Sequence, residues 1–242
     1  MTVDYLWLGL AIWLGFTVQA VAGFGSMVVA VSLSSLMFAI PELLPILIPL
    51  NILATGSMAW QCRRDVDWML LLKGILPSMI LGMGAGILLL DELPGKALKT
   101  GFALLVLWFA LREWIKLYRN LPMNPRPAWW RQLWTLLAGL AQGLYGSGGP
   151  LLVYAIGSKG LNKAAFRAVL LCVWFSLNSL YTVVMLFQHK VQPVAGLILL
   201  YAPLLYLAIR LGNYLHHRVD ERQFKQGVCA LLVMSALAML VS

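Results

Sequence analysis

QGLYGSGGP, residues 142–150, places four glycines and one proline inside a long apolar part of the chain. A related stretch, QAVAGFGS at residues 19–26, lies 123 positions earlier, and each copy begins with a glutamine. Glycine and proline at this density predict a break in a helix. Within hydrocarbon, a broken helix is tolerated only where it is buried in protein or lines a cavity. Two breaks at corresponding positions of two halves indicate the binding site of a membrane transporter.

The composition indicates a polytopic membrane protein without a soluble domain. The chain is 61% hydrophobic and 11% charged, with a mean hydropathy of +0.84, whereas a soluble domain carries about 25% charged residues. Cys62, Cys172 and Cys229 have neither disulfide nor zinc-ligand spacing. The net charge of +9 is explained by lysines and arginines in cytoplasmic loops, where membrane proteins carry an excess of them. We therefore expect no metal, no cofactor and no nucleic-acid partner.

An internal duplication extends beyond the two glycine motifs. Asn51 and Thr55 match Asn178 and Thr182 at an offset of 127. Four further pairs match at an offset of 126: Pro77 and Pro203, Gly86 and Gly212, Lys99 and Lys225, and Gly101 and Gly227. A colinear series of this kind predicts two repeats joined by the proline-rich segment 118–130.

Segment lengths predict the same elements in each repeat. Residues 5–40 would form a helix of about 54 Å, too long for one crossing of a hydrocarbon core of about 30 Å, so we expect a hairpin that turns at residues 23–26. Such a hairpin either dips to mid-membrane or crosses twice. The first repeat, 1–117, then holds a hairpin over 5–40 and helices near 43–61, 68–90 and 96–115. The second, 131–242, holds a hairpin over 132–157 and helices near 167–187, 193–211 and 224–241.

Basic residues predict the orientation. Fourteen of the 18 fall near 63–64, 112–131, 159–167 and 210–225, and lysine and arginine favour cytoplasmic loops. Both termini are then outside and the 118–130 linker is cytoplasmic. Each repeat has three full crossings after its hairpin, so the repeats have inverted topology. The expected fold is an all-α polytopic membrane protein with two inverted repeats.

The two glycine motifs resemble those of the sulfite exporter TauE/SafE family, which carries a glycine-rich signature in each half. The second copy, Gly146-Ser147-Gly148-Gly149-Pro150, is the better match, because the first has Ser26 and Met27 in place of Gly149 and Pro150. The resemblance covers essentially the whole chain. It implies secondary transport of small anions, especially sulfite and organosulfonates, across the bacterial inner membrane.

A neutral anion site follows from the chemistry of the breaks. Backbone N–H groups at a helix start attract anions, and glycine lets the backbone approach a ligand closely; leucine at Gly148 should therefore occupy the place of the anion. Polar residues repeated at membrane depth are further candidates. The predicted substrate-binding residues are Gln19, Gly23, Phe24, Gly25, Ser26, Asn51, Gln142, Tyr145, Gly146, Ser147, Gly148, Gly149 and Asn178.

Several residues have competing interpretations. Hydrogen bonding between helices would also explain the Asn pair, and close helix packing explains Gly82–Gly86 better than a ligand does. Arg167 lies near a predicted cytoplasmic helix end, where it either snorkels or attracts anions to an entrance. All nine acidic residues fall at predicted ends or loops, so no carboxylate–histidine proton relay is expected.

The leading functional hypothesis is a transporter of small sulfur-containing anions in the lipid bilayer. A carrier of small carboxylates is the alternative, because a cradle of amides does not identify the central atom of its ligand. An enzyme is not expected, since convergent nucleophiles, carboxylates and histidines are missing. A membrane scaffold would leave the duplicated breaks unexplained. A homodimer stays open.

Overall fold

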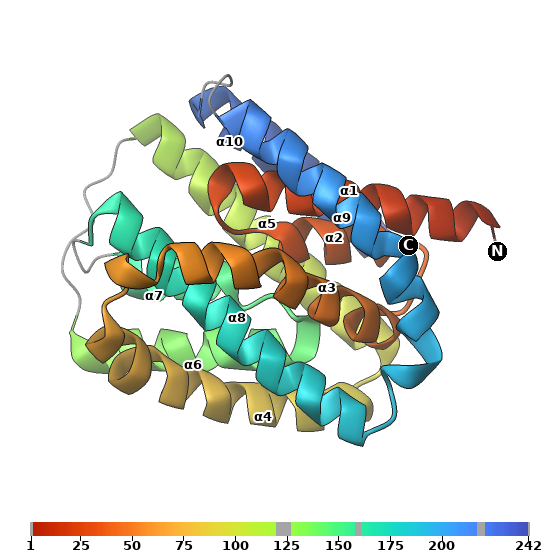
Figure 1. Ribbon diagram of the computed structural model, residues 1–242, viewed down its shortest axis with the longest axis horizontal. Coiled ribbons are helices and arrows are strands. Elements are labelled where there is room, and N and C mark those ends of the chain that lie inside the picture. The colour runs from red at the N-terminus through yellow and green to blue at the C-terminus, as the bar shows by residue number, and fades with distance from the viewer. Residues whose placement is uncertain (1, 120–126, 158–160, 217–220, 242) are drawn as a thin grey trace.

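The computed structural model describes residues 2–119, 127–157, 161–216 and 221–241, and these are almost entirely helical (Figure 1). The first half contains α1 (Thr2–Ala22), α2 (Ser26–Ser34), α3 (Ile40–Gln61), the short η1 (Arg63–Asp65), the π-helical η2 (Leu70–Ile75), α4 (Leu76–Glu92) and α5 (Gly95–Arg119). The second contains α6 (Ala128–Tyr145), α7 (Gly149–Ile156), α8 (Lys163–Phe187), η4 (Gln192–Val194), α9 (Ala195–His216) and α10 (Glu221–Val241). No described residue lies in a β-strand.

Five of the helical segments in the described ranges are long and apolar enough to cross a membrane: Val3–Val21, Ile40–Gln61, Leu70–Glu92, Ala164–Phe187 and Gln192–Gly212. A shorter apolar segment, Gln226–Val241, lies in α10. These spans confirm the prediction of an all-helical polytopic membrane protein. Much of the predicted linker 118–130, together with Lys159 and Arg218 of the basic clusters, lies outside the described residues.

The two hairpins have one long and one short arm. The returning helices α2 and α7 have nine and eight residues, so they span about 13 and 12 Å. A hydrocarbon core is about 30 Å thick. Neither short arm is long enough to cross such a core by itself.

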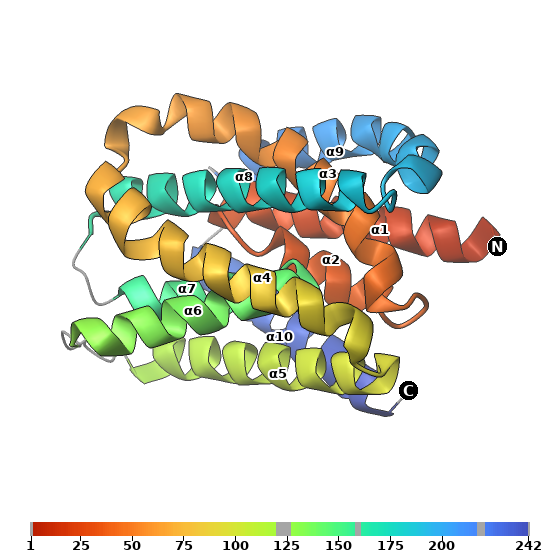
Figure 2. The same ribbon diagram turned by 90° about the horizontal axis from the view of Figure 1, so that it is seen from below.

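The long helices pair across the two halves in a repeating pattern. α4 packs on α6 and its counterpart α9 packs on α1, while α3 packs on α8 and α5 on α10. In both ribbon views α1 and α6 run in opposite directions along the bundle (Figures 1 and 2). The N-terminal end of α1, the start of α5 and the end of α10 lie at one end of the bundle, and α5 ends and α6 begins at the other.

Glycines bring these pairs of helices into backbone contact. A Cβ added to Gly86 would overlap the carbonyl oxygen of Leu140 on α6 and approach Gly143. The same arrangement occurs between α9 and α1, where a Cβ on Gly212 would overlap Ala20 and lie 2.8 Å from the carbonyl oxygen of Thr17. Gly82 likewise faces the backbone of Leu136. Close helix packing is therefore the role of Gly82 and Gly86, as the sequence suggested.

Candidate functional site

Both long arms end in the same left-handed glycine turn. Gly23 follows α1 with a φ of 81°, and Gly146 follows α6 with a φ of 62°. The N–H of Gly23 donates to the carbonyl of Gln19 at 2.7 Å, and the N–H of Gly146 donates to the carbonyl of Gln142 at 2.9 Å. Side chains with a Cβ rarely adopt this conformation. The repeated Gln-x-x-x-Gly spacing thus produces the same helix end twice.

The short helices begin inside the protein and leave N–H groups free. The first intrahelical donors are Val29, which bonds to Gly25 O at 3.1 Å, and Leu152, which bonds to Gly148 O at 3.1 Å. The N–H groups before these positions have no partner within their helices. Pro150 has no backbone N–H group, so it leaves no donor unpaired. Unpaired donors and the positive end of the helix dipole together favour an anion.

A small cavity of about 20 Å³ lies between the two breaks. Its polar lining comes from equivalent elements of the two halves: Gln19, Gly25, Ser26 and Asn51 from the first, and Gln142, Gly146, Ser147, Gly149 and Asn178 from the second. The six polar side chains among them are at most 3% exposed. The volume suits about one water molecule, so the site is contracted in this conformation.

A continuous chain of side-chain amides joins the halves across the cavity. Gln142 Nε2 donates to Asn178 Oδ1 at 2.7 Å, and Asn178 Nδ2 donates to Asn51 Oδ1 at 2.8 Å. Asn51 Nδ2 then donates to Ser26 Oγ at 2.9 Å and to Gln19 Oε1 at 3.2 Å. The two asparagines therefore both line the cavity and connect the two halves.

The backbone fixes the direction of this chain. The N–H of Gly148 donates to Gln142 Oε1 at 3.0 Å, and a backbone N–H can only donate. Gln142 must therefore point its NH₂ group at Asn178. Each following amide is oriented in turn, until the Gln19 oxygen faces Asn51 and its nitrogen points away. One peptide group in the second half thus orients a side chain in the first.

Two polar groups at the cavity, one on the last amide of the network and one outside the network, have no partner among the described residues. Gln19 Nε2 and Ser147 Oγ are buried and make no hydrogen bond within the described part of the chain. Both residues line the cavity. An amide NH₂ and a hydroxyl can both donate to an oxyanion. The arrangement is therefore a neutral site that offers donors from both halves.

Comparison with known protein families agrees with this architecture. The family described as Sulfite exporter TauE/SafE matches residues 7–239 of the 242-residue chain. The chain belongs to this family. Comparison with curated proteins and with solved structures gives no significant match. Membership in TauE/SafE confirms the resemblance seen in the motifs, and it makes the chain an integral membrane protein of an anion-exporter family.

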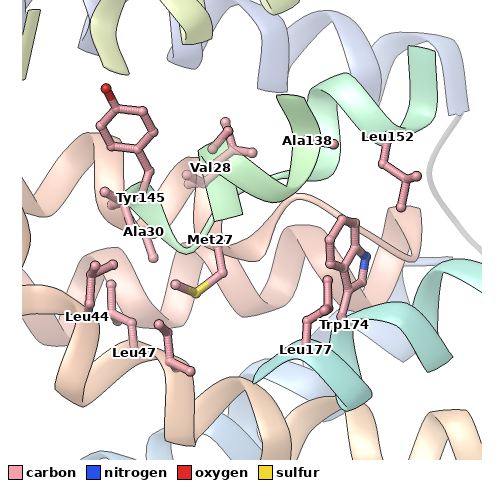
Figure 3. Close-up of a cluster of buried hydrophobic side chains, with 14 of the residues drawn as sticks. Met27, Val28, Ala30, Leu44, Leu47, Ala138, Tyr145, Leu152, Trp174 and Leu177 are labelled. Carbon is pink, nitrogen blue, oxygen red and sulfur yellow. The ribbon is translucent and has the colours of Figure 1, made fainter. Parts of the chain in front are cut away.

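Four of the residues expected to bind substrate do not line the cavity of this TauE/SafE protein: Gly23, Phe24, Tyr145 and Gly148. Tyr145 packs on Phe102 of α5, with ring centroids 4.8 Å apart, and it points away from Trp174 (Figure 3). A Cβ on Gly148 would overlap the carbonyl oxygen of Ala138. The expectation that leucine at Gly148 fills the anion position was therefore wrong, because the first atom it would displace belongs to α6.

Three apolar residues of the lining did not stand out in the sequence: Met27, Val28 and Trp174. Met27 lies between Leu44 and Leu47 on α3 and Trp174 and Leu177 on α8 (Figure 3). Trp174 is 7% exposed, and a Cβ on Gly149 would lie 3.6 Å from its ring. Trp174 precedes Asn178 by four residues, which puts both on one helix face. This spacing from Asn178 could have identified Trp174 from the sequence as a residue that lines the cavity.

Arg167 of the TauE/SafE chain lies against the first break. It belongs to the first turns of α8, and a Cβ on Gly23 would be 3.1 Å from its Cγ and 3.2 Å from its Nε. The Nε is buried without a hydrogen-bond partner, and no described carboxylate pairs with the guanidinium. A positive charge is thus held beside the turn that carries the site.

Proposed function

We propose that this TauE/SafE protein is a secondary transporter that moves small sulfur-containing oxyanions, sulfite and organosulfonates, through the cavity between its two helix breaks. One observation carries the proposal: Gln19 Nε2 and Ser147 Oγ are buried at the cavity without partners. A buried polar group left unpaired costs about 1–3 kcal/mol. An anion that accepts hydrogen bonds from both groups removes this cost, and this favours its binding.

The small volume of the cavity supports transport by alternating access. About 20 Å³ holds a water molecule, whereas an oxyanion of four or more heavy atoms needs more room. The hydrogen bond from Asn178 to Asn51 crosses between the halves at 2.8 Å, and it is the contact that must lengthen for the site to expand. We expect an anion to enter when this contact opens and the two halves rock apart.

The helix pairing supports an inverted repeat. α4 and α9 make equivalent contacts with α6 and α1, and α1 and α6 run in opposite directions (Figure 2). Two halves of this kind exchange roles when the site changes the side to which it opens. A site at their boundary is then open to each side in turn.

The orientation proposed is both termini outside and the basic clusters in the cytoplasm. Arg63, Arg64, Arg112 and Lys116 belong to clusters that follow the positive-inside rule in this orientation. A reporter enzyme that works only in the periplasm should therefore be inactive when it is fused after residue 125. Activity of that fusion in the periplasm would contradict the orientation.

Small carboxylates are the second candidate substrate. The cavity offers hydrogen-bond donors to oxygen atoms, and these do not distinguish sulfur from carbon at the centre of the ligand. Only steric fit against Met27 and Trp174, which line the cavity, discriminates between a pyramidal sulfite and a planar carboxylate. Carboxylate transport is therefore a competing outcome of the same experiment.

The test is counterflow of radiolabelled sulfite in proteoliposomes that contain the purified protein. Unlabelled sulfite, methanesulfonate and acetate compete in parallel, and protein-free liposomes provide the background. We expect sulfite and methanesulfonate to drive exchange and acetate to be much weaker. Exchange driven by acetate alone would favour the carboxylate carrier, and a lack of exchange with every anion would remove the transport proposal.

A further inference from the structure

A second and larger cavity, of about 440 Å³, lies at the end of the bundle that holds the start of α5 and the end of α10. Its wall also includes the connection between α2 and α3, residues 35–39. These three segments lie near one another in both ribbon views (Figures 1 and 2). The cavity between the two helix breaks, here called the central cavity, shares none of its lining residues with this outer cavity.

One wall of this outer cavity is cationic. Lys96, Lys99 and Thr100 line it, and their spacing of three and four residues puts them on one face of α5. Gly95 begins α5, so the free N–H groups of its first turn lie beside the lysines.

The described part of the chain offers the two lysines no opposite charge. Within the described ranges, neither Lys96 nor Lys99 forms an ion pair, and no carboxylate lines the cavity. Lys190, by contrast, pairs with Asp91 at 3.0 Å. Glu42, the carboxylate nearest in sequence to the 35–39 connection, accepts the N–H of Ala39 at 3.3 Å.

The rest of the outer cavity is lined mainly by apolar side chains. Leu36, Met37 and Phe38 contribute from the connection, and Met239 and Leu240 from the end of α10. A cavity lined by two lysines and by several apolar side chains suits an anion that has an apolar body.

We propose that the outer cavity binds an organic oxyanion, with its sulfonate or phosphate head at Lys96 and Lys99 and its apolar body against Leu36 and Phe38. The source is either a soluble organosulfonate or the headgroup region of an anionic lipid. Helix α2 connects this cavity to the central one, because Ser26 lines the central cavity and Ser35 lines the outer cavity. The two residues are about 13 Å apart along the helix. A soluble anion held here is therefore one short helix from the central site.

Isothermal titration of the full-length protein in a neutral detergent tests this site, with butanesulfonate as the probe. The Ser147→Ala background weakens the central site, so the remaining binding reports the outer cavity. In that background, Lys96→Gln combined with Lys99→Gln should weaken butanesulfonate binding about tenfold. Lys190→Gln removes one positive charge from a half-buried lysine that pairs with Asp91 outside the cavity, and it should change the affinity less than about twofold.

Three results would overturn the proposal: no effect of the double substitution, an equal effect of Lys190→Gln, or complete loss of binding with Ser147→Ala alone. The last result would place all binding at the central site. Because these measurements follow binding in the outer cavity, they are independent of whether the central site transports sulfite.

Nanodiscs then identify the source of the anion. Phosphatidylglycerol nanodiscs that block butanesulfonate binding, when phosphatidylcholine nanodiscs do not, would support the site with a lipid as its ligand. Equal butanesulfonate binding in both lipids would support the site with a soluble ligand.

Discussion

Replacement of Ser147 by alanine separates ligand binding from folding more cleanly than any other change at the central site. The Ser147 hydroxyl is buried, lines the cavity and has no hydrogen-bond partner. Alanine therefore removes no hydrogen bond within the described protein. Because an unpaired buried polar group costs about 1–3 kcal/mol, the free energy of unfolding should stay the same or rise by up to about 1 kcal/mol.

Anion affinity should change in the opposite direction. A hydrogen bond to a charged ligand contributes about 1.5–3 kcal/mol, which corresponds to a loss of about ten- to hundredfold in affinity. Titration calorimetry with sulfite gives the dissociation constant, and the thermal midpoint of the same sample gives the stability. Wild-type stability with weakened binding is the expected pair of results.

Ser32→Ala provides the matched control. Ser32 is fully buried on α2, and its hydroxyl donates to Val29 O at 3.1 Å outside the cavity. This substitution should leave sulfite affinity unchanged. Our reasoning would be refuted if Ser147→Ala kept wild-type affinity, or if both substitutions weakened binding equally.

Three further substitutions test the architecture. Gly86→Ala should destabilise the protein by about 1–3 kcal/mol, because its Cβ would overlap the backbone of α6, whereas Gly84→Ala meets no atom within 4 Å and should be neutral in thermal unfolding. Asn178→Leu leaves partners on both sides unpaired, so it should lower the thermal midpoint as well as the affinity; an unchanged midpoint would show that the amide chain does not join the halves. Arg167→Gln should slow sulfite association severalfold and reduce its dependence on salt, and association kinetics that keep the wild-type salt dependence would exclude electrostatic attraction by this residue.

The sequence alone determined the class of the protein and the positions of its helix breaks. Hydropathy identified the apolar segments of α1, α3, α4, α8 and α9, which are long enough to cross a membrane, since hydrocarbon accepts little charge. The turns at Gly23 and Gly146 were equally predictable, because left-handed φ angles depend on the residue itself and its nearest neighbours. The repeated glutamines and asparagines also pointed to the right part of the molecule, and they line one cavity.

Only the tertiary structure decided how these residues meet. Asn51 and Asn178 are 127 positions apart, and their contact at 2.8 Å depends on how α3 packs on α8. The direction of the amide chain depends on one backbone N–H, at Gly148. Tyr145 and Ser147 belong to the same glycine motif, but Tyr145 faces α5. The turn at Gly146 lies between them and points their side chains in different directions. Local conformation follows from residues a few positions apart, whereas the hydrogen-bond partner of a buried polar group is selected by the packing of helices distant in the chain.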